Sequence, residues 1–139
     1  MDNEALRKKN LETIYKFLEC KGPERRITRA PLFTPDGRKE MELRIGEKVI
    51  MQDQPFQQWL DETAEMFPDW GFYENTIFQT EDPNVFLVKS NGRGCEVHGG
   101  VSTPVSSFYI NEFLMEGGKI KRFRETLNPC EKLHIGEKK

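Results

Sequence analysis

The fold is decided by residues 67–88, FPDWGFYENTIFQTEDPNVFLV, where the pattern of apolar residues changes from helical spacing to alternation. From Trp70 onward, apolar and polar side chains alternate with period two, which predicts β-strands. Residues 81–84 (EDPN) have the composition of a turn, so they should separate the first two strands. Continued to the C-terminal side, the same reading predicts five strands at residues 71–80, 85–91, 94–98, 105–115 and 119–127.

The turns between the later strands are predicted from glycine. Asn91-Gly92 is a typical two-residue hairpin turn, and residues 116–119 (EGGK) contain two further glycines. The segment 91–94 (NGRG) precedes a strand and not a helix, so we interpret it as a hairpin turn and not as a phosphate-binding loop. These turns predict an antiparallel meander.

Helical patterns dominate the residues before this stretch. Residues 3–19 have apolar side chains at helical spacing, and residues 24–30 can form a short second helix that ends at Pro31. A third helix should be capped by Asp53 and end before Pro68. Its apolar stripe consists of Phe56, Trp59, Leu60, Thr63, Met66 and Phe67.

One strand is predicted among these helices. Residues 34–37 (TPDG) have turn composition, and Met41, Leu43 and Ile45 then alternate with charged residues. Helices that precede a hairpin-linked meander predict an α+β fold, with the helices packed on one face of a strongly curved antiparallel sheet. The length of 139 residues fits a single domain, 1–139, in which residues 129–139 are a polar C-terminal tail.

Composition narrows the range of partners. The 21 lysines and arginines are interspersed with 23 aspartates and glutamates, so nucleic acid is not an expected partner. The first residues are polar, and apolar runs are too short to span a membrane, so we expect a cytoplasmic protein without membrane association. Cys20, Cys95 and Cys130 are far apart and odd in number, so no disulfide is expected.

Three segments carry a resemblance to a known family. Residues 5–26 (ALRKKNLETIYKFLECKGPERR), 67–88 and 116–128 (EGGKIKRFRETLN) resemble, in this order and spacing, the PhzA/B family of phenazine biosynthesis. The resemblance covers roughly residues 4–128. It implies the SnoaL-like cone fold shared with ketosteroid isomerase and scytalone dehydratase, a homodimer, and a pocket between the helices and the concave sheet.

The resemblance also implies a function. The family is thought to help two molecules of an aminocyclohexenone carboxylic acid condense, amine onto ketone, towards the phenazine scaffold, and no cofactor is expected. This chemistry needs a proton donor, so that hydroxide can leave the carbinolamine as water, and a cation that holds the substrate carboxylate.

Glu125 matches the acid/base glutamate of that family. Strand alternation places it on the apolar face shared by Phe123 and Leu127, where a carboxyl group should be either neutral or paired, because an isolated charge there is costly. The alternative is an exposed glutamate that pairs with Arg122 or Arg124.

Arg29 matches the carboxylate-binding arginine of the family. A guanidinium can hold a carboxylate through two parallel hydrogen bonds, which fixes the orientation of a planar acid. The alternative is a solvated surface arginine, and because Arg25 and Arg26 lie nearby, the role could belong to any of the three.

The chain departs from the family on the third helix. Trp59 and Thr63 occupy the positions of the family's cavity-facing histidine and serine, and an indole cannot exchange a proton as a histidine does. Trp59 can also be simple core packing. The protein could therefore be a non-catalytic binder of an aromatic molecule, stacked on Trp59, Phe72 and Tyr73, or an isomerase or dehydratase acting on a polyketide-like ring.

A metal site is not expected. Cys95 and His98 are three residues apart, but no acidic cluster accompanies them, and two histidines are too few for a typical site. His134 lies in the polar tail and is interpreted as a surface residue.

Overall fold

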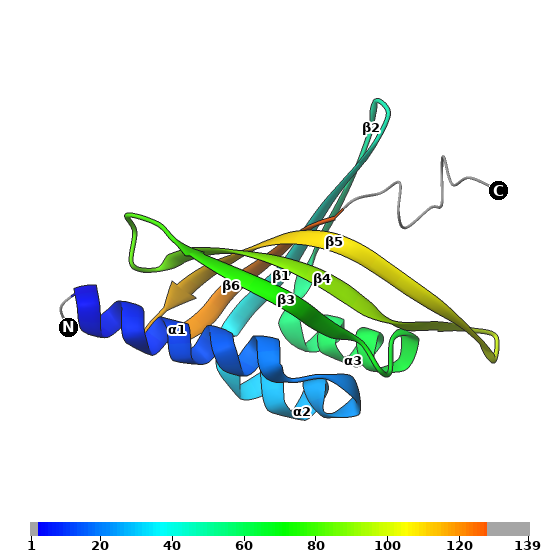
Figure 1. The fold of residues 1–139 in the computed structure, drawn as a ribbon, viewed down its shortest axis with the longest axis horizontal. Coiled ribbons are helices and arrows are strands. Elements are labelled where there is room, and N and C mark those ends of the chain that lie inside the picture. Colours follow the sequence, from blue (N-terminus) through cyan, green and yellow to red (C-terminus); the bar gives the residue numbers. More distant parts are fainter. Residues whose placement is uncertain (1–2, 128–139) are drawn as a thin grey trace.

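The computed structural model describes residues 3–127, and the predicted tail 129–139, with Cys130 and His134, lies outside the described residues. Three α-helices pack on one face of a six-stranded sheet that curves over them (Figure 1). The helices are α1 (Asn3–Glu19), α2 (Arg25–Arg29) and α3 (Phe56–Met66), with 3-10 turns at Gly22–Glu24 and Ala30–Leu32. The strands are β1 (Phe33–Ile45), β2 (Lys48–Pro55), β3 (Gly71–Gln79), β4 (Val85–His98), β5 (Val101–Glu116) and β6 (Lys119–Leu127).

The sheet has the strand order β2-β1-β6-β5-β4-β3. The C-terminal strands form the predicted meander, in which β3 to β6 pair antiparallel in sequence order. The hairpin β1–β2 joins this meander through a parallel pairing of β1 with β6, in which Met41 lies opposite Glu125. This parallel pairing places β1 beside the last described strand, and it shapes the site described below.

The first helix forms where its pattern predicts it. Ile14, Phe17 and Leu18 are buried against the sheet, and the ring of Phe17 contacts Phe113 and Phe123 with centroid distances of 5.2 and 4.8 Å. Burial of these apolar side chains is the main source of stability for such a helix. The prediction of a helix over residues 3–19 is confirmed.

The predicted start of the third helix is wrong, because a strand that the sequence pattern did not reveal ends there. Asp53 lies in β2, where its Oδ1 accepts a hydrogen bond of 2.9 Å from Nε of Arg38, and Pro55 occupies the position before the first helical residue. The pattern failed because Val49, Ile50 and Met51 are consecutive and exposed at the sheet edge, so period two is absent.

Residues 34–37 are not a free turn. They form a bulge within β1, because Phe33 pairs with Ile120 while Arg38 already pairs with Arg122. Inside the bulge, Oγ1 of Thr34 donates a hydrogen bond of 2.9 Å to Asp36. The residues predicted to form a turn are thus extra residues within the strand.

The predicted turn at Asn91-Gly92 is also wrong, because β4 continues to His98 and turns at Gly99-Gly100. Both of these glycines have positive φ, as a tight hairpin requires. Gly92 serves a different purpose, since a Cβ atom there would collide with the rings of Trp70 and Tyr109. A glycine inside a strand can thus mark the close approach of a ring instead of a turn.

Two expectations about the chain as a whole can be compared with the described residues. Among residues 3–127, no helix is both long enough and apolar enough to cross a membrane. Cys20 and Cys95 are free thiols that are partly exposed.

Candidate functional site

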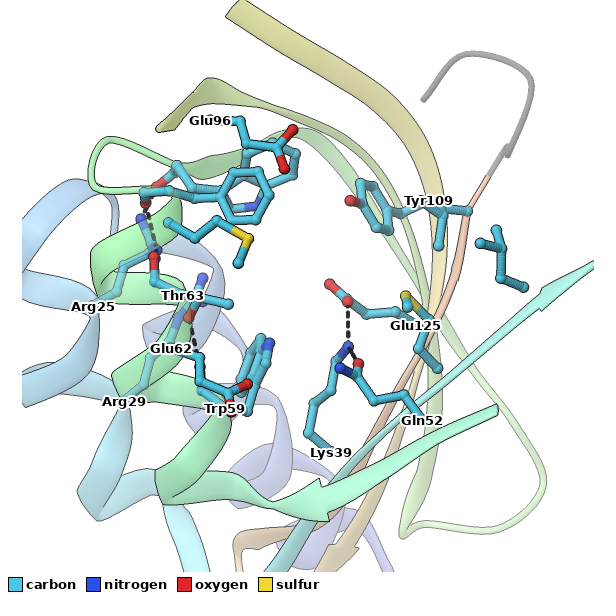
Figure 2. A pocket seen from close by; sticks show the side chains of 16 residues that line it. Arg25, Arg29, Lys39, Gln52, Trp59, Glu62, Thr63, Glu96, Tyr109 and Glu125 are labelled. Atoms are coloured by element: carbon cyan, nitrogen blue, oxygen red, sulfur yellow. Dashed lines mark hydrogen bonds and ion pairs between the residues drawn. The ribbon is translucent and has the colours of Figure 1, made fainter. Parts of the chain in front are cut away.

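A cavity of about 270 Å³ lies between the helices α2 and α3 and the inner face of the sheet. Most of its wall is apolar, and a few charged side chains reach it from opposite sides (Figure 2). Such a mixture of an apolar lining and a small number of polar groups is typical of small-molecule sites. The apolar lining includes Met41, Leu43, Met66, Phe67, Trp70 and Leu127.

Glu125 lies in the sheet wall of this cavity. It is 8% exposed, and its Oε1 lies 2.9 Å from Nζ of Lys39, which is 2% exposed. Arg122 and Arg124 instead pair with glutamates of β1. The predicted burial of Glu125 is therefore confirmed, and of the two expected states, neutral or paired, the structure has the paired one.

Lys39 was not identified from the sequence. Its Nζ also donates a hydrogen bond of 2.7 Å to Oε1 of Gln52, so neighbouring strands β2, β1 and β6 each contribute one polar group (Figure 2). The same Nζ lies 5.7 Å from the ring centroid of Trp59. A signal existed, because Lys39 precedes Met41 and Leu43 by two and four residues and therefore shares their face of β1.

Arg29 is a buried residue and not a solvated one. It is 1% exposed and reaches the cavity from the helical side, while its Nε donates to the carbonyl of Phe17 (3.1 Å) and its NH2 to that of Cys20 (3.5 Å). Its guanidinium also lies 3.9 Å from the ring centroid of Phe17. Burial, reinforced by the nearby charge of Arg25, lowers the pKa of Arg29 to about 9.

The three candidate arginines have separate environments. Arg25 is buried as well and donates to the carbonyls of Trp70 (2.9 Å), Phe67 (2.8 Å) and Thr63 (3.2 Å), and burial lowers its pKa. Arg26 is exposed and lies 3.8 Å from Asp61. Arg25 and Arg29 therefore hold the carbonyl ends of α3 and α1, where a cation also interacts favourably with the helix dipole.

Trp59 and Thr63 both line the cavity, as their shared stripe predicted. Trp59 is 5% exposed, and its ring packs against Phe17 and Phe123 at centroid distances of 6.3 and 5.2 Å. Oγ1 of Thr63 donates a hydrogen bond of 2.8 Å to the carbonyl of Trp59. The indole is thus a core residue that presents part of its surface to the cavity.

Phe72 and Tyr73 lie elsewhere, and neither is among the described residues that line the cavity. Phe72 is fully buried next to Trp70 and Tyr109. The ring of Tyr73 lies 4.1 Å from the guanidinium of Arg93. The structure does not bring these two aromatic residues together with Glu125.

Tyr109 and Glu96 are further cavity residues that the sequence did not reveal. Burial, together with the negative charges of Glu125 and Glu96, raises the pKa of Tyr109, so its hydroxyl remains protonated and can donate a hydrogen bond into the cavity. Oε2 of Glu96 lies 2.7 Å from Nε2 of His98. Over residues 3–127, no three His, Cys, Asp or Glu side chains are grouped as metal ligands would be.

Comparisons with known proteins agree with this architecture. Residues 1–137 match the family model of phenazine biosynthesis protein A/B. The chain is 38% identical over 135 residues to phenazine biosynthesis protein PhzA2 of Pseudomonas aeruginosa, an alignment that covers 95% of this chain and 83% of that protein.

Solved structures show the same fold. The phenazine biosynthesis-related protein PhzB2 of Pseudomonas aeruginosa superimposes with a TM-score of 0.82 at 31% identity, covering 96% of this chain and 84% of that one. A protein described as a SnoaL-like polyketide cyclase from Jannaschia sp. CCS1 has a TM-score of 0.63 at 15% identity, over 95% and 94% of the two chains. The predicted α+β cone fold is confirmed, and the chain belongs to the phenazine biosynthesis protein A/B family.

Proposed function

We propose that the cavity binds a small cyclic or aromatic carboxylic acid, and that the protein assists the condensation of cyclic amino-ketone carboxylic acids towards a phenazine scaffold. One observation carries this proposal. A buried carboxyl group, Glu125, projects into a largely apolar cavity beside the ammonium group of Lys39. Family membership supports phenazine biosynthesis as the context of this chemistry.

The proposed role of Glu125 follows from the reaction. When the amine of one molecule adds to the ketone of another, a carbinolamine forms, and its hydroxyl group leaves as water only if it receives a proton. Glu125, when protonated, is the proposed donor to that hydroxyl oxygen. Arg29 and Lys39 are cations in the cavity wall that favour the carboxylate of the ligand. No cofactor takes part in this scheme.

The test uses Glu125→Gln, which preserves shape and hydrogen bonding but cannot transfer a proton. We expect this variant to bind phenazine-1-carboxylic acid nearly as well as the unmodified protein, and to lose its acceleration of the condensation of an aminocyclohexenone carboxylic acid. Thr126→Ser, at the next position of the same strand, is the matched control. A variant that accelerates the condensation fully would show that Glu125 is not the acid.

A second candidate is binding without catalysis, and Trp59 favours it. Trp59 stands where the sequence resemblance places a proton-exchanging histidine, and its ring is packed into the core. In this case the unmodified protein would bind aromatic acids but would not accelerate the condensation. The same assay therefore separates the two candidates.

We also propose a homodimer formed through the outer face of the sheet. Phe78 on β3 and Ile110 on β5 are 46% and 43% exposed on this face, and a partner would remove such apolar surface from water. Light scattering at micromolar protein concentration tests the proposal. A monomeric mass would refute it.

A further inference from the structure

Two of the charged side chains that line the cavity form an ion pair with each other. Lys39 and Glu125 form an ion pair of 2.9 Å, and their side chains are 3% and 10% exposed. An ammonium group has three N–H donors, and Glu125 and Gln52 accept two of them in the described structure. Lys39 can therefore offer a further hydrogen bond to a ligand without first losing a partner.

The buried arginines differ from Lys39 in the groups that they bind. Arg29 directs Nε and NH2 to the carbonyls of Phe17 and Cys20. Arg25 donates to carbonyls at the end of α3 and to the carbonyl of Trp70. A guanidinium has five N–H donors, and the hydrogen bonds to these carbonyls use only part of those of Arg29. A ligand that took over the donors already in use would leave buried carbonyl groups without hydrogen bonds, which is costly. Among the described cations of the cavity, Lys39 is the one whose partner is itself a carboxylate.

A ligand carboxylate changes the balance of charge. The Lys39–Glu125 pair is neutral, so an acid bound to Lys39 places a second carboxylate next to Glu125. Two carboxylates that share one cation in an apolar site are not both ionised at low cost, and one of them takes up a proton. The other charged or titratable residues that line the cavity are Arg25, Arg29, Glu62, Glu96 and Tyr109.

These five residues together carry no net charge. The two arginines are balanced in sign by Glu62 and Glu96, and Tyr109 keeps its proton because its pKa is raised. An acid bound to Lys39 therefore gives the cavity an excess negative charge, and this charge lies beside Glu125. Glu125 is 8% exposed, so water contributes little to its charged form, whereas the ligand carboxylate would gain a hydrogen bond from Lys39.

We propose that Lys39 directly binds the carboxylate of the ligand, and that this binding is coupled to the uptake of one proton by Glu125. The inference rests on the proposed function, because it takes from it that the ligand is a carboxylic acid. Its consequence is that the substrate itself loads the general acid. The proton reaches Glu125 when a ligand is bound and not before.

Calorimetric titration measures this coupling directly. Phenazine-1-carboxylate and phenazine-1-carboxamide are titrated near pH 7 in phosphate and in Tris, whose heats of ionisation differ. For the acid, we expect the buffer dependence of the binding heat to correspond to about one proton taken up, and the affinity to fall by about tenfold per pH unit as the pH rises. For the amide, we expect neither effect.

Variants assign the two roles. Glu125→Gln should bind the acid without proton uptake and with a flat pH dependence. Lys39→Met should bind the acid at least about tenfold more weakly while its affinity for the amide stays unchanged, as expected when a charge-assisted hydrogen bond is lost. The double variant Lys39→Met/Glu125→Gln should show the same loss of affinity for the acid, and it leaves no unpaired carboxylate in the cavity. Lys121→Met, on the exposed part of β6, is the control.

The outcomes separate this inference from the proposed function. If the acid binds without proton uptake, or equally well after Lys39→Met, the coupling is refuted while the cavity remains a binding site. If neither probe binds to the unmodified protein, the proposed ligand class is wrong and the inference is refuted with it.

Discussion

The helical wall and the sheet wall of the cavity both bury cationic side chains, but they satisfy them with different acceptors. On the helical wall, Arg25 and Arg29 donate to backbone carbonyls at the ends of α3 and α1. On the sheet wall, Lys39 donates to the side chains of Glu125 and Gln52. The first arrangement joins side chains to the backbone of the helices, whereas the second joins side chains to one another.

The difference teaches which buried charges are available for function. A backbone carbonyl is neutral and fixed by its helix, so an arginine bound to it cannot exchange partners without exposing the helix end. A carboxylate partner can rotate or take up a proton, and another anion can replace it. Burial does not distinguish Arg29 from Lys39, but their acceptors do, because one acceptor of Lys39 is a carboxylate.

The largest effect is expected when one member of the Lys39–Glu125 pair is removed. Glu125→Leu leaves a buried ammonium group without its counter-charge and should lower the free energy of unfolding by about 3 kcal/mol. Lys39→Met/Glu125→Leu removes both charges and should recover most of this loss. Urea denaturation measures both values, and a double variant no more stable than the single one would show that the two charges are not coupled.

A smaller loss is expected from the helical wall. Arg29→Met leaves the carbonyls of Phe17 and Cys20 without their donor and should cost about 2 kcal/mol of stability, with no second substitution that rescues it. Arg26→Met, at an exposed position of the same helix, should change stability by less than about 0.5 kcal/mol. If Arg29→Met were as stable as the unmodified protein, the structural role of this residue would be refuted.

This contrast also explains what the sequence could predict. The helices and the meander follow from local periodicity, and alternation along β6 correctly placed Glu125 on the inner face. The partner of Glu125 is 86 residues away, and it depends on the parallel pairing of β1 with β6, which no local pattern encodes. Residue type did not indicate which cation pairs with Glu125, since arginine and lysine are both cationic and usually exposed.

Errors at the other end of the cavity have a similar cause. Asn91-Gly92 has the composition of a turn, but Gly92 is required because Trp70 occupies the space of a side chain. That ring comes from the segment before β3, so the reason for the glycine is tertiary. Tyr109 was missed because it reaches the cavity through the curvature of β5, which the alternation of residues along the strand does not reveal.

Gly92 offers a way to disturb the junction between the two walls. Trp70, whose ring packs over Gly92, accepts a hydrogen bond from Arg25 through its carbonyl, so it links the sheet to the helical wall. Gly92→Ala should force this ring aside and lower stability by about 1 to 2 kcal/mol. Lys89→Ala, an exposed position of β4, is the control, and intrinsic tryptophan fluorescence reports whether the ring has moved.

The smallest effect is expected at an exposed counterpart of the buried pair. Glu74 receives two hydrogen bonds from Arg93, of 2.7 and 3.0 Å, and one from Asn91, and these hydrogen bonds lower its pKa from 4.5 to about 2. Because the folded state holds the proton less tightly than the unfolded state, this stabilisation is complete above pH 4.5 and is lost as the pH falls towards 2. Glu74→Gln should therefore lower the melting temperature slightly at pH 7, and the gap should narrow under acidic conditions and in about 1 M salt, which screens exposed charges. Scanning calorimetry of both proteins across this pH range, at low and high salt, measures the gap. A gap that is independent of pH and salt would mean that Glu74 acts through its shape and not its charge. The exposed pair would then no longer serve as the screened counterpart of the buried Lys39–Glu125 pair.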